Sequence, residues 1–169
     1  MYKNKLIYGI ITARGGSKSI PNKNIKKING KPLIYYSIAT SLKSKLIDRT
    51  IMSTDSSKIL ALGKKFNCEV PFLRPKKIAK DKSTDFEVFK HLSNWLKRND
   101  KRPSYYVHLR PTHPIRNYKI IDLAIKKLIE KKNYDSLRSL SVSKETPFKT
   151  WIKKNKGIVP IVKFKKIKD

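Results

Sequence analysis

The chain has 169 residues, of which 38% are hydrophobic and 31% are charged, a composition that excludes a disordered chain and suits one globular domain. A formal charge of +29 ordinarily suggests a nucleic-acid partner. The basic residues are scattered along the chain, however, so we interpret most of the charge as a solvated surface and do not expect specific nucleic-acid binding. The apolar segments are too short to span a bilayer, and the single Cys68 indicates a reducing, cytoplasmic location.

Predicted strands and helices alternate along the chain. Continuous apolar runs indicate strands that are buried on both faces, and apolar residues at helical spacing indicate amphipathic helices. This alternation predicts an α/β fold with a mostly parallel sheet and helices on both faces. In chain order we expect a strand over 5–12, a helix from Pro32 to about 42, a strand over 49–53, a helix over 56–66, a short strand over 69–73, a helix over 85–97, a strand over 105–109 and a helix over 118–129.

Several large side chains are expected to pack rather than to perform chemistry. His108 falls inside a predicted strand and is expected to be a packed residue, not a base. Trp95 and Trp151 are expected to be core or interface aromatics. The helix over 85–97 is expected to bury one stripe made of Phe86, Phe89, Leu92 and Leu96.

Three polar segments follow predicted strands, at residues 14–24, 54–55 and 110–116. A parallel sheet gathers such segments at its carboxyl edge, where ligands of this fold class bind. Gly15 and Gly16 can adopt backbone angles closed to other residues, which would turn successive N–H groups toward one anion, while Lys18 and Lys23 add positive charge. The first segment therefore predicts a phosphate cradle, although it matches neither GxxxxGK[ST] nor GxGxxG.

Some candidate residues also have a plainer structural interpretation. Asp55 either caps the helix that follows it or contacts a ligand. Asp81 and Ser83 either cap the next helix or contribute to a site. Arg74 either precedes a turn-forming proline or binds a ligand.

Five stretches in one order carry a family resemblance: ARGGSKSIPNKNIKKINGKPLI, STDS, RPKKIAKDKST, LRPTHPIR and YDSLRSLS. Together they resemble the acylneuraminate cytidylyltransferases, or CMP-N-acetylneuraminic acid synthetases, including those for legionaminic and pseudaminic acid. The resemblance implies a Rossmann-like three-layer nucleotidyltransferase fold that forms one cytidylyltransferase domain over 1–169. Residues 143–169 resemble the start of the family's dimerisation excursion.

The resemblance implies transfer of CMP from CTP to the anomeric hydroxyl of a nonulosonic acid, a sialic-type nine-carbon sugar, with release of pyrophosphate. It also implies Mg²⁺ bound with CTP and a homodimer. Arg14 and Lys23 would be catalytic and hold the triphosphate. The implied nucleotide site comprises Ala13, Arg14, Gly15, Gly16, Ser17, Lys23, Asn24, Asp55, Arg74 and Ser83, and the implied sugar site comprises Arg110, Thr112 and Arg116.

The sequence departs from the family in two places. The Asn-Gly-Ala-Ile-Tyr strand and the Asp-x-Asp metal motif of the usual C-terminal part do not occur, which leaves the metal ligands unassigned. Arg110 stands where classical sialic acid enzymes carry glutamine, which leaves the identity of the sugar open. Two alternatives stay open: a truncated CTP-binding protein with little or no catalysis, and a basic nucleic-acid-binding protein.

Overall fold

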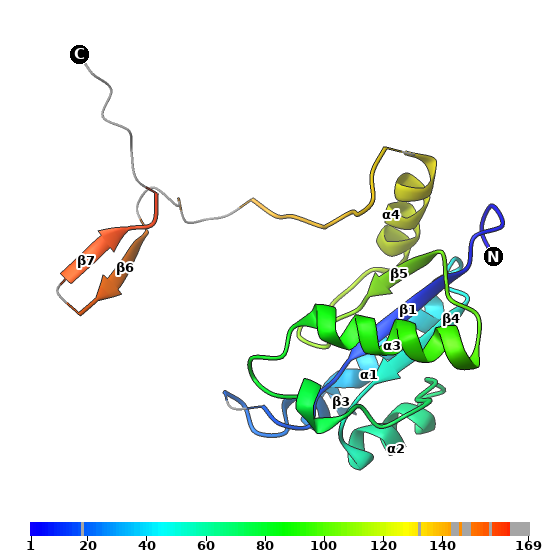
Figure 1. The fold of residues 1–169 in the computed structure, drawn as a ribbon, viewed down its shortest axis with the longest axis horizontal. Helices are drawn as coiled ribbons and strands as arrows, with labels where there is room; N and C mark the ends of the chain where they lie inside the picture. Colours follow the sequence, from blue (N-terminus) through cyan, green and yellow to red (C-terminus); the bar gives the residue numbers. More distant parts are fainter. Residues whose placement is uncertain (18, 132, 143–145, 147–149, 156, 163–169) are drawn as a thin grey trace. The chain divides into compact units, whose positions relative to one another are not determined.

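The computed structural model describes residues 1–17, 19–131, 133–142, 146, 150–155 and 157–162. The chain divides into two compact units, Met1–Tyr134 and Asp135–Asp169, each of which is described by itself (Figure 1). The single cytidylyltransferase domain expected over 1–169 stays a prediction. No helix in the described part of the chain is long and apolar enough to cross a membrane.

The first unit is built on a parallel sheet of the order β4-β1-β5, as the alternation of elements predicted. β1 (Ile7–Thr12) is the central strand, with β4 (Arg49–Ser53) and β5 (Tyr105–His108) on its two sides. Ile10 of β1 pairs with Ile51 on one side and with His108 on the other. β1 is buried along almost its whole length, which explains its uninterrupted apolar sequence.

The short strand expected over 69–73 is not formed, so that prediction is wrong. The segment makes only two isolated parallel bridges to the β4 edge, Ile51 with Glu69 and Thr54 with Leu73. Pro71 lies between the two bridges and has no N–H to donate, which interrupts a continuous ladder. The segment nevertheless runs beside β4 and delivers Arg74 to the carboxyl edge of the sheet.

Helices cover both faces of the sheet, which confirms the predicted layers. One core cluster packs Ile34 and Ile38 of α1 (Leu33–Lys43) and Ile59 of α2 (Ser57–Lys65) against Ile11 and Met52 of the sheet. The second cluster packs α3 against the opposite face, and Figure 1 shows α3 crossing that face. The remaining elements of this unit are α3 (Asp85–Asn99), α4 (Tyr118–Glu130), the 3-10 helices η1 (Lys23–Ile25) and η2 (Lys76–Ile78), and the paired short strands β2 (Lys27–Ile28) and β3 (Lys31–Pro32).

The stripe that α3 buries differs from the expected one at its first position. Val88, Leu92 and Leu96 are buried, whereas Phe86 is 73% exposed. Residues four apart lie on one side of a helix, and the row through Val88 is the one that faces the sheet. Trp95 packs against this cluster beside Phe72, as expected for a core aromatic.

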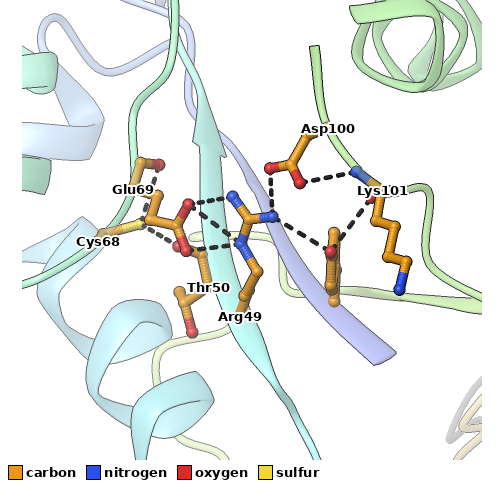
Figure 2. A network of polar contacts seen from close by, with 7 residues as sticks. Arg49, Thr50, Cys68, Glu69, Asp100 and Lys101 are labelled. Atoms are coloured by element: carbon orange, nitrogen blue, oxygen red, sulfur yellow. Dashed lines mark hydrogen bonds and ion pairs between the residues drawn. The ribbon is translucent and has the colours of Figure 1, made fainter. Parts of the chain in front are cut away.

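An ion-pair network closes the amino edge of the sheet around Arg49, the first residue of β4 (Figure 2). Its Nε donates to both carboxylate oxygens of Glu69, at 2.9 and 3.2 Å, and its Nη1 donates to Asp100 at 2.5 Å. The same Nη1 donates to the Tyr8 hydroxyl at 3.2 Å. These bonds, above all those to Glu69, raise the pKa of Arg49. The guanidinium is therefore fully engaged by the protein itself.

The buried Cys68 lies next to this network. Its thiol donates to the Thr50 carbonyl oxygen at 3.5 Å (Figure 2). Burial raises the pKa of the thiol to about 12, so it stays neutral and packs as a small apolar residue.

The second unit contains one antiparallel pair, β6 (Trp151–Lys154) with β7 (Gly157–Pro160). Trp151 is 55% exposed, so it is not a core aromatic, and its expected role at an interface stays a prediction. Of the segment 143–169 that resembles the dimerisation excursion, residues 143–145, 147–149, 156 and 163–169 lie outside the described residues.

Candidate functional site

The carboxyl edge of the sheet carries a cleft of about 450 Å³. Its walls come from the loops after β1 and β5 and from the segment between Arg74 and α3. Two of the three segments that the sequence placed at this edge, 14–24 and 110–116, therefore meet there, whereas residues 54–55 are not in the lining. Eight residues predicted from the sequence line it: Arg14, Ser17, Lys23, Asn24, Arg74, Ser83, Arg110 and Thr112. Five predicted residues are not in its lining: Ala13, Gly15, Gly16, Asp55 and Arg116.

The bend after β1 is held by a carboxylate. The Gly15 N–H donates to Asp55 Oδ1 at 2.9 Å, and a Cβ at Gly15 would lie 3.0 Å from the Ser56 Cβ. The close approach of this bend to Ser56 therefore favours glycine. The expected reason, backbone angles closed to other residues, is wrong for Gly15 and Gly16, because neither has a positive φ. Lys18, which was expected to add charge to the cradle, lies outside the described residues.

Asn24 supports the same bend from the other side. This residue is buried in η1, and its Nδ2 donates to the Arg14 carbonyl oxygen at 2.8 Å. Asn24 therefore fixes the backbone that presents Arg14, and Lys23 beside it lines the cleft.

Two cleft arginines are paired with carboxylates from one segment. Arg14 Nη1 lies 2.8 Å from Asp81 Oδ1, and Arg110 pairs with Asp85, the first residue of α3. The side chains of Arg14 and Asp81 are 34% and 40% exposed, so water and solutes reach this pair. The positive charge of the cleft is thus partly neutralised by residues of the chain itself.

Arg74 is the most unusual side chain of the cleft, because it is a buried cation with unfilled donors. Only 6% of the residue is exposed, and its Nε and Nη2 have no hydrogen-bond partner among the described residues. Nη2 lies 3.8 Å from Asp55 Oδ1, which is an ion-pair distance but too long for a hydrogen bond. Burial lowers the pKa of Arg74, and the Asp55 charge opposes that shift. Both atoms are shielded from solvent, so the hydration they lose on burial is not replaced by the described residues.

The structure resolves the plainer interpretations of three polar residues. α2 is capped by Ser56, which accepts from the Ile59 N–H, so Asp55 is not its cap. α3 is capped by Thr84, so neither Asp81 nor Ser83 performs that role. Ser83 instead accepts a hydrogen bond from the Lys80 N–H at 3.1 Å, which shapes the cleft wall.

Sequence reasoning missed Thr12 and Lys80 as residues of the cleft. Thr12 ends β1, and its Oγ1 lies 3.0 Å from His108 Nε2. His108 packs edge-on against Phe89, as expected for a packed residue. Burial lowers the pKa of His108, while the charge of Asp85 opposes the shift. Thr12 could have been predicted as a cleft residue, because it is the last residue of a strand that ends at the cleft. No pattern in the sequence distinguishes Lys80 from the other lysines.

Arg116, a predicted sugar ligand, is engaged within the protein. Its Nη2 donates to the Arg110 carbonyl oxygen at 2.5 Å, and its Nη1 donates to the Ser37 hydroxyl at 3.0 Å. The guanidinium thereby links the loop after β5 to α1. A role for Arg116 in contacting sugar stays a prediction.

The cleft does not offer a protein-built metal site. Within the part of the chain that the structure describes, no three or more His, Cys, Asp or Glu side chains gather closely enough to hold an ion. Mg²⁺ prefers several oxygen ligands in octahedral geometry. The residues described here therefore do not fit a dedicated Mg²⁺ site, and the expected Mg²⁺ stays a prediction.

Comparison with known proteins identifies the family. Residues 8–159 match the family model described as Cytidylyltransferase. The chain belongs to the cytidylyltransferase family. The pseudaminic acid cytidylyltransferase of Campylobacter jejuni is 36% identical over 121 residues, which are 72% of this chain and 52% of that protein. The CMP-N,N'-diacetyllegionaminic acid synthase of Legionella pneumophila is 33% identical over 119 residues, 70% of this chain and 51% of that protein.

Solved structures of other proteins share the fold. A CMP:2-keto-3-deoxy-manno-octonic acid synthetase complexed with CTP superposes with a TM-score of 0.62 at 17% identity, covering 75% of this chain and 48% of that chain. The Rossmann-like α/β fold implied by the sequence resemblance is thereby confirmed. The chain spans about half the length of these cytidylyltransferases.

Proposed function

We propose that the chain binds CTP in the cleft at the carboxyl edge of its sheet and transfers CMP to the anomeric hydroxyl of a nonulosonic acid. The observation that carries this proposal is the convergence of Arg14, Lys23, Arg74 and Arg110 on one cleft in a cytidylyltransferase fold. In this reaction the hydroxyl oxygen forms a bond to the α-phosphorus, the bond to the β-phosphate oxygen breaks, and pyrophosphate and a proton are released. The chemistry requires alignment and neutralisation of charge, which cationic side chains supply.

The roles of the basic residues follow from their positions. Arg14 and Lys23 lie in the loop after β1, where their half-buried charges line the cleft and can hold phosphate oxygens. Arg74 has unfilled donors in the cleft wall, which suit an uncharged carbonyl oxygen or a phosphate oxygen of the nucleotide equally. Asn24 positions the Arg14 backbone, so its contribution would be indirect.

The sugar would lie beside Arg110 and Thr112 in the same cleft. A nonulosonic acid carries a carboxylate, and an exposed guanidinium such as that of Arg110 is a suitable partner for it. The relatives are named for pseudaminic, N-acylneuraminic or diacetyllegionaminic acid, and these names support this substrate class. They do not distinguish among the three sugars for this chain.

Three further features belong to the same proposal. Mg²⁺ would enter with the CTP phosphates, because the described residues build no metal site of their own. A homodimer is expected from the resemblance of 143–169 to the family's dimerisation excursion. A cytoplasmic location rests on the single cysteine, since CTP-dependent sugar activation and a free thiol both suit that compartment.

The test is titration calorimetry of the full chain with CTP, followed by measurement of pyrophosphate release with each of the three sugars. We expect saturable binding that Arg14→Ala weakens at least about tenfold, as for loss of a charge-assisted hydrogen bond. Arg98→Ala, which removes an exposed arginine in the last turn of α3, is the matched control and should leave the affinity unchanged.

Other outcomes would contradict the proposal in distinct ways. The chain could bind CTP but release no pyrophosphate with each of the three sugars in the presence of Mg²⁺. This outcome would favour the non-catalytic CTP-binding protein. Absence of CTP binding together with steeply salt-dependent binding to arbitrary DNA would favour the nucleic-acid-binding protein.

A further inference from the structure

The cleft contains two carboxylates among its cations, and both come from the stretch that runs from the end of η2 to the first residue of α3. Asp81 lies in the turn after η2, and Asp85 is the first residue of α3. Asp85 has a structural reason to be acidic, because a carboxylate in the first turn of a helix is favoured by the helix dipole. Asp81 lies outside the helix, so that explanation does not apply to it.

Asp81 faces the bend that would hold the phosphates. Its Oδ1 lies 2.8 Å from Arg14 Nη1, and the two residues come from opposite walls of the cleft, the loop after β1 and the turn after η2. Both side chains are about one-third exposed or more, so the pair forms in water rather than in the core. A pair of this kind is held weakly and can exchange one anion for another.

We propose that Asp81 is a specificity-determining residue that competes with the phosphates of the nucleotide for Arg14. Its carboxylate occupies the position of a phosphate oxygen while the cleft is empty, and CTP binds by displacing it. This inference rests on the proposed function, because it requires that the cleft binds CTP.

Displacement makes the cleft selective for highly charged ligands. A triphosphate brings several negative charges into a region that also contains Lys23 and Arg110, so it can form several ion pairs in place of the one between Arg14 and Asp81. A nucleoside without phosphates forms no ion pair with Arg14, so it does not displace Asp81. Removal of the Asp81 charge should therefore raise the binding affinity for phosphate-bearing ligands only.

The experiment compares CTP, pyrophosphate and cytidine as ligands of the full chain by titration calorimetry at low salt, in the presence of a chelator. The variant is Asp81→Asn, which keeps the size of the side chain and removes its charge. The control is Glu130→Gln, which changes the net charge equally at the end of α4, where Glu130 contacts Tyr2 and Lys3. Asp81→Ser provides a second variant, and thermal unfolding confirms that each protein is folded.

We expect both Asp81 variants to bind CTP and pyrophosphate about two- to tenfold more tightly than the wild type, as for loss of one exposed competing charge. Their affinity for cytidine and the affinities of Glu130→Gln should stay within about twofold of the wild type. Unchanged or weakened CTP binding by the Asp81 variants, with a wild type that binds CTP, overturns this inference alone. A wild type that does not bind CTP overturns the proposed function and this inference together.

Discussion

Two arginines at opposite edges of one sheet show how differently a protein can use the same side chain. Arg49 lies at the amino end of β4 and donates to Glu69 and Asp100 (Figure 2). It also donates to the Tyr8 hydroxyl. Arg74 lies at the carboxyl edge, is almost fully buried, and leaves Nε and Nη2 without a hydrogen-bond partner among the described residues. The first arginine completes the fold, whereas the second is a buried cation whose donors are incompletely filled.

The difference has an energetic meaning. A buried charge that is incompletely paired lowers the free energy of unfolding, because its lost hydration is not replaced. Arg49 avoids this cost, since it keeps partial exposure and a bidentate carboxylate partner. Arg74 carries the cost in the empty protein, and an oxygen-rich ligand would remove it. Three changes test this comparison, in order of decreasing expected effect.

Arg74→Met removes the unfilled donors while keeping an unbranched side chain of similar reach. We expect CTP affinity to fall about 10- to 100-fold, as for loss of charge-assisted hydrogen bonds in a desolvated site. The free energy of unfolding should stay the same or rise, because a desolvated cation is replaced by an apolar group. Calorimetry with CTP and urea denaturation measure the two quantities. A large loss of stability with unchanged CTP affinity would show that Arg74 is a structural residue like Arg49.

Arg49→Met is the complementary change at the amino edge. It leaves Glu69 and Asp100 without their shared cation and removes the contact of the guanidinium with the Tyr8 ring. We expect the free energy of unfolding to fall by about 1 kcal/mol, as for a partly exposed ion-pair network screened by water, with CTP affinity unchanged. Arg98→Met, on the exposed last turn of α3, is the control in the same urea titrations. Equal stability of the two variants would mean that the network contributes nothing.

The sequence predicted the edge of the sheet better than it predicted individual contacts. Strand periodicity and the parallel-sheet rule correctly brought Arg14 and Arg110 into one cleft, because that prediction depends only on where strands end. Arg74 was predicted from the family resemblance alone. The pairing of Arg14 with Asp81 could not be predicted, since it joins residues far apart in sequence through a turn of no regular pattern. Pairing of the Gly15 N–H with Asp55 was missed for the same reason.

The smallest expected effect is a difference between the two edges in how their contribution to the free energy of unfolding depends on pH. At the carboxyl edge, burial lowers the pKa of His108 below its ordinary value of 6.5. As the pH falls below that value, the unfolded chain binds a proton that the folded chain does not, so stability decreases.

At the amino edge, the Lys101 N–H and Arg49 lower the pKa of Asp100 below 3.8, so its contribution is lost only in stronger acid. Urea denaturation at pH 7.5 and 5.5 therefore reports on the histidines and not on Asp100. Burial also lowers the pKa of His91 in α3, so the share of His108 is measured by comparing the wild type with His108→Asn. We expect a loss of stability at pH 5.5 that is smaller than that of Arg49→Met and that His108→Asn reduces, since the substituted side chain does not titrate. An identical pH dependence in the variant would contradict this assignment, because the lost stability would then come from groups other than the histidine beneath the cleft.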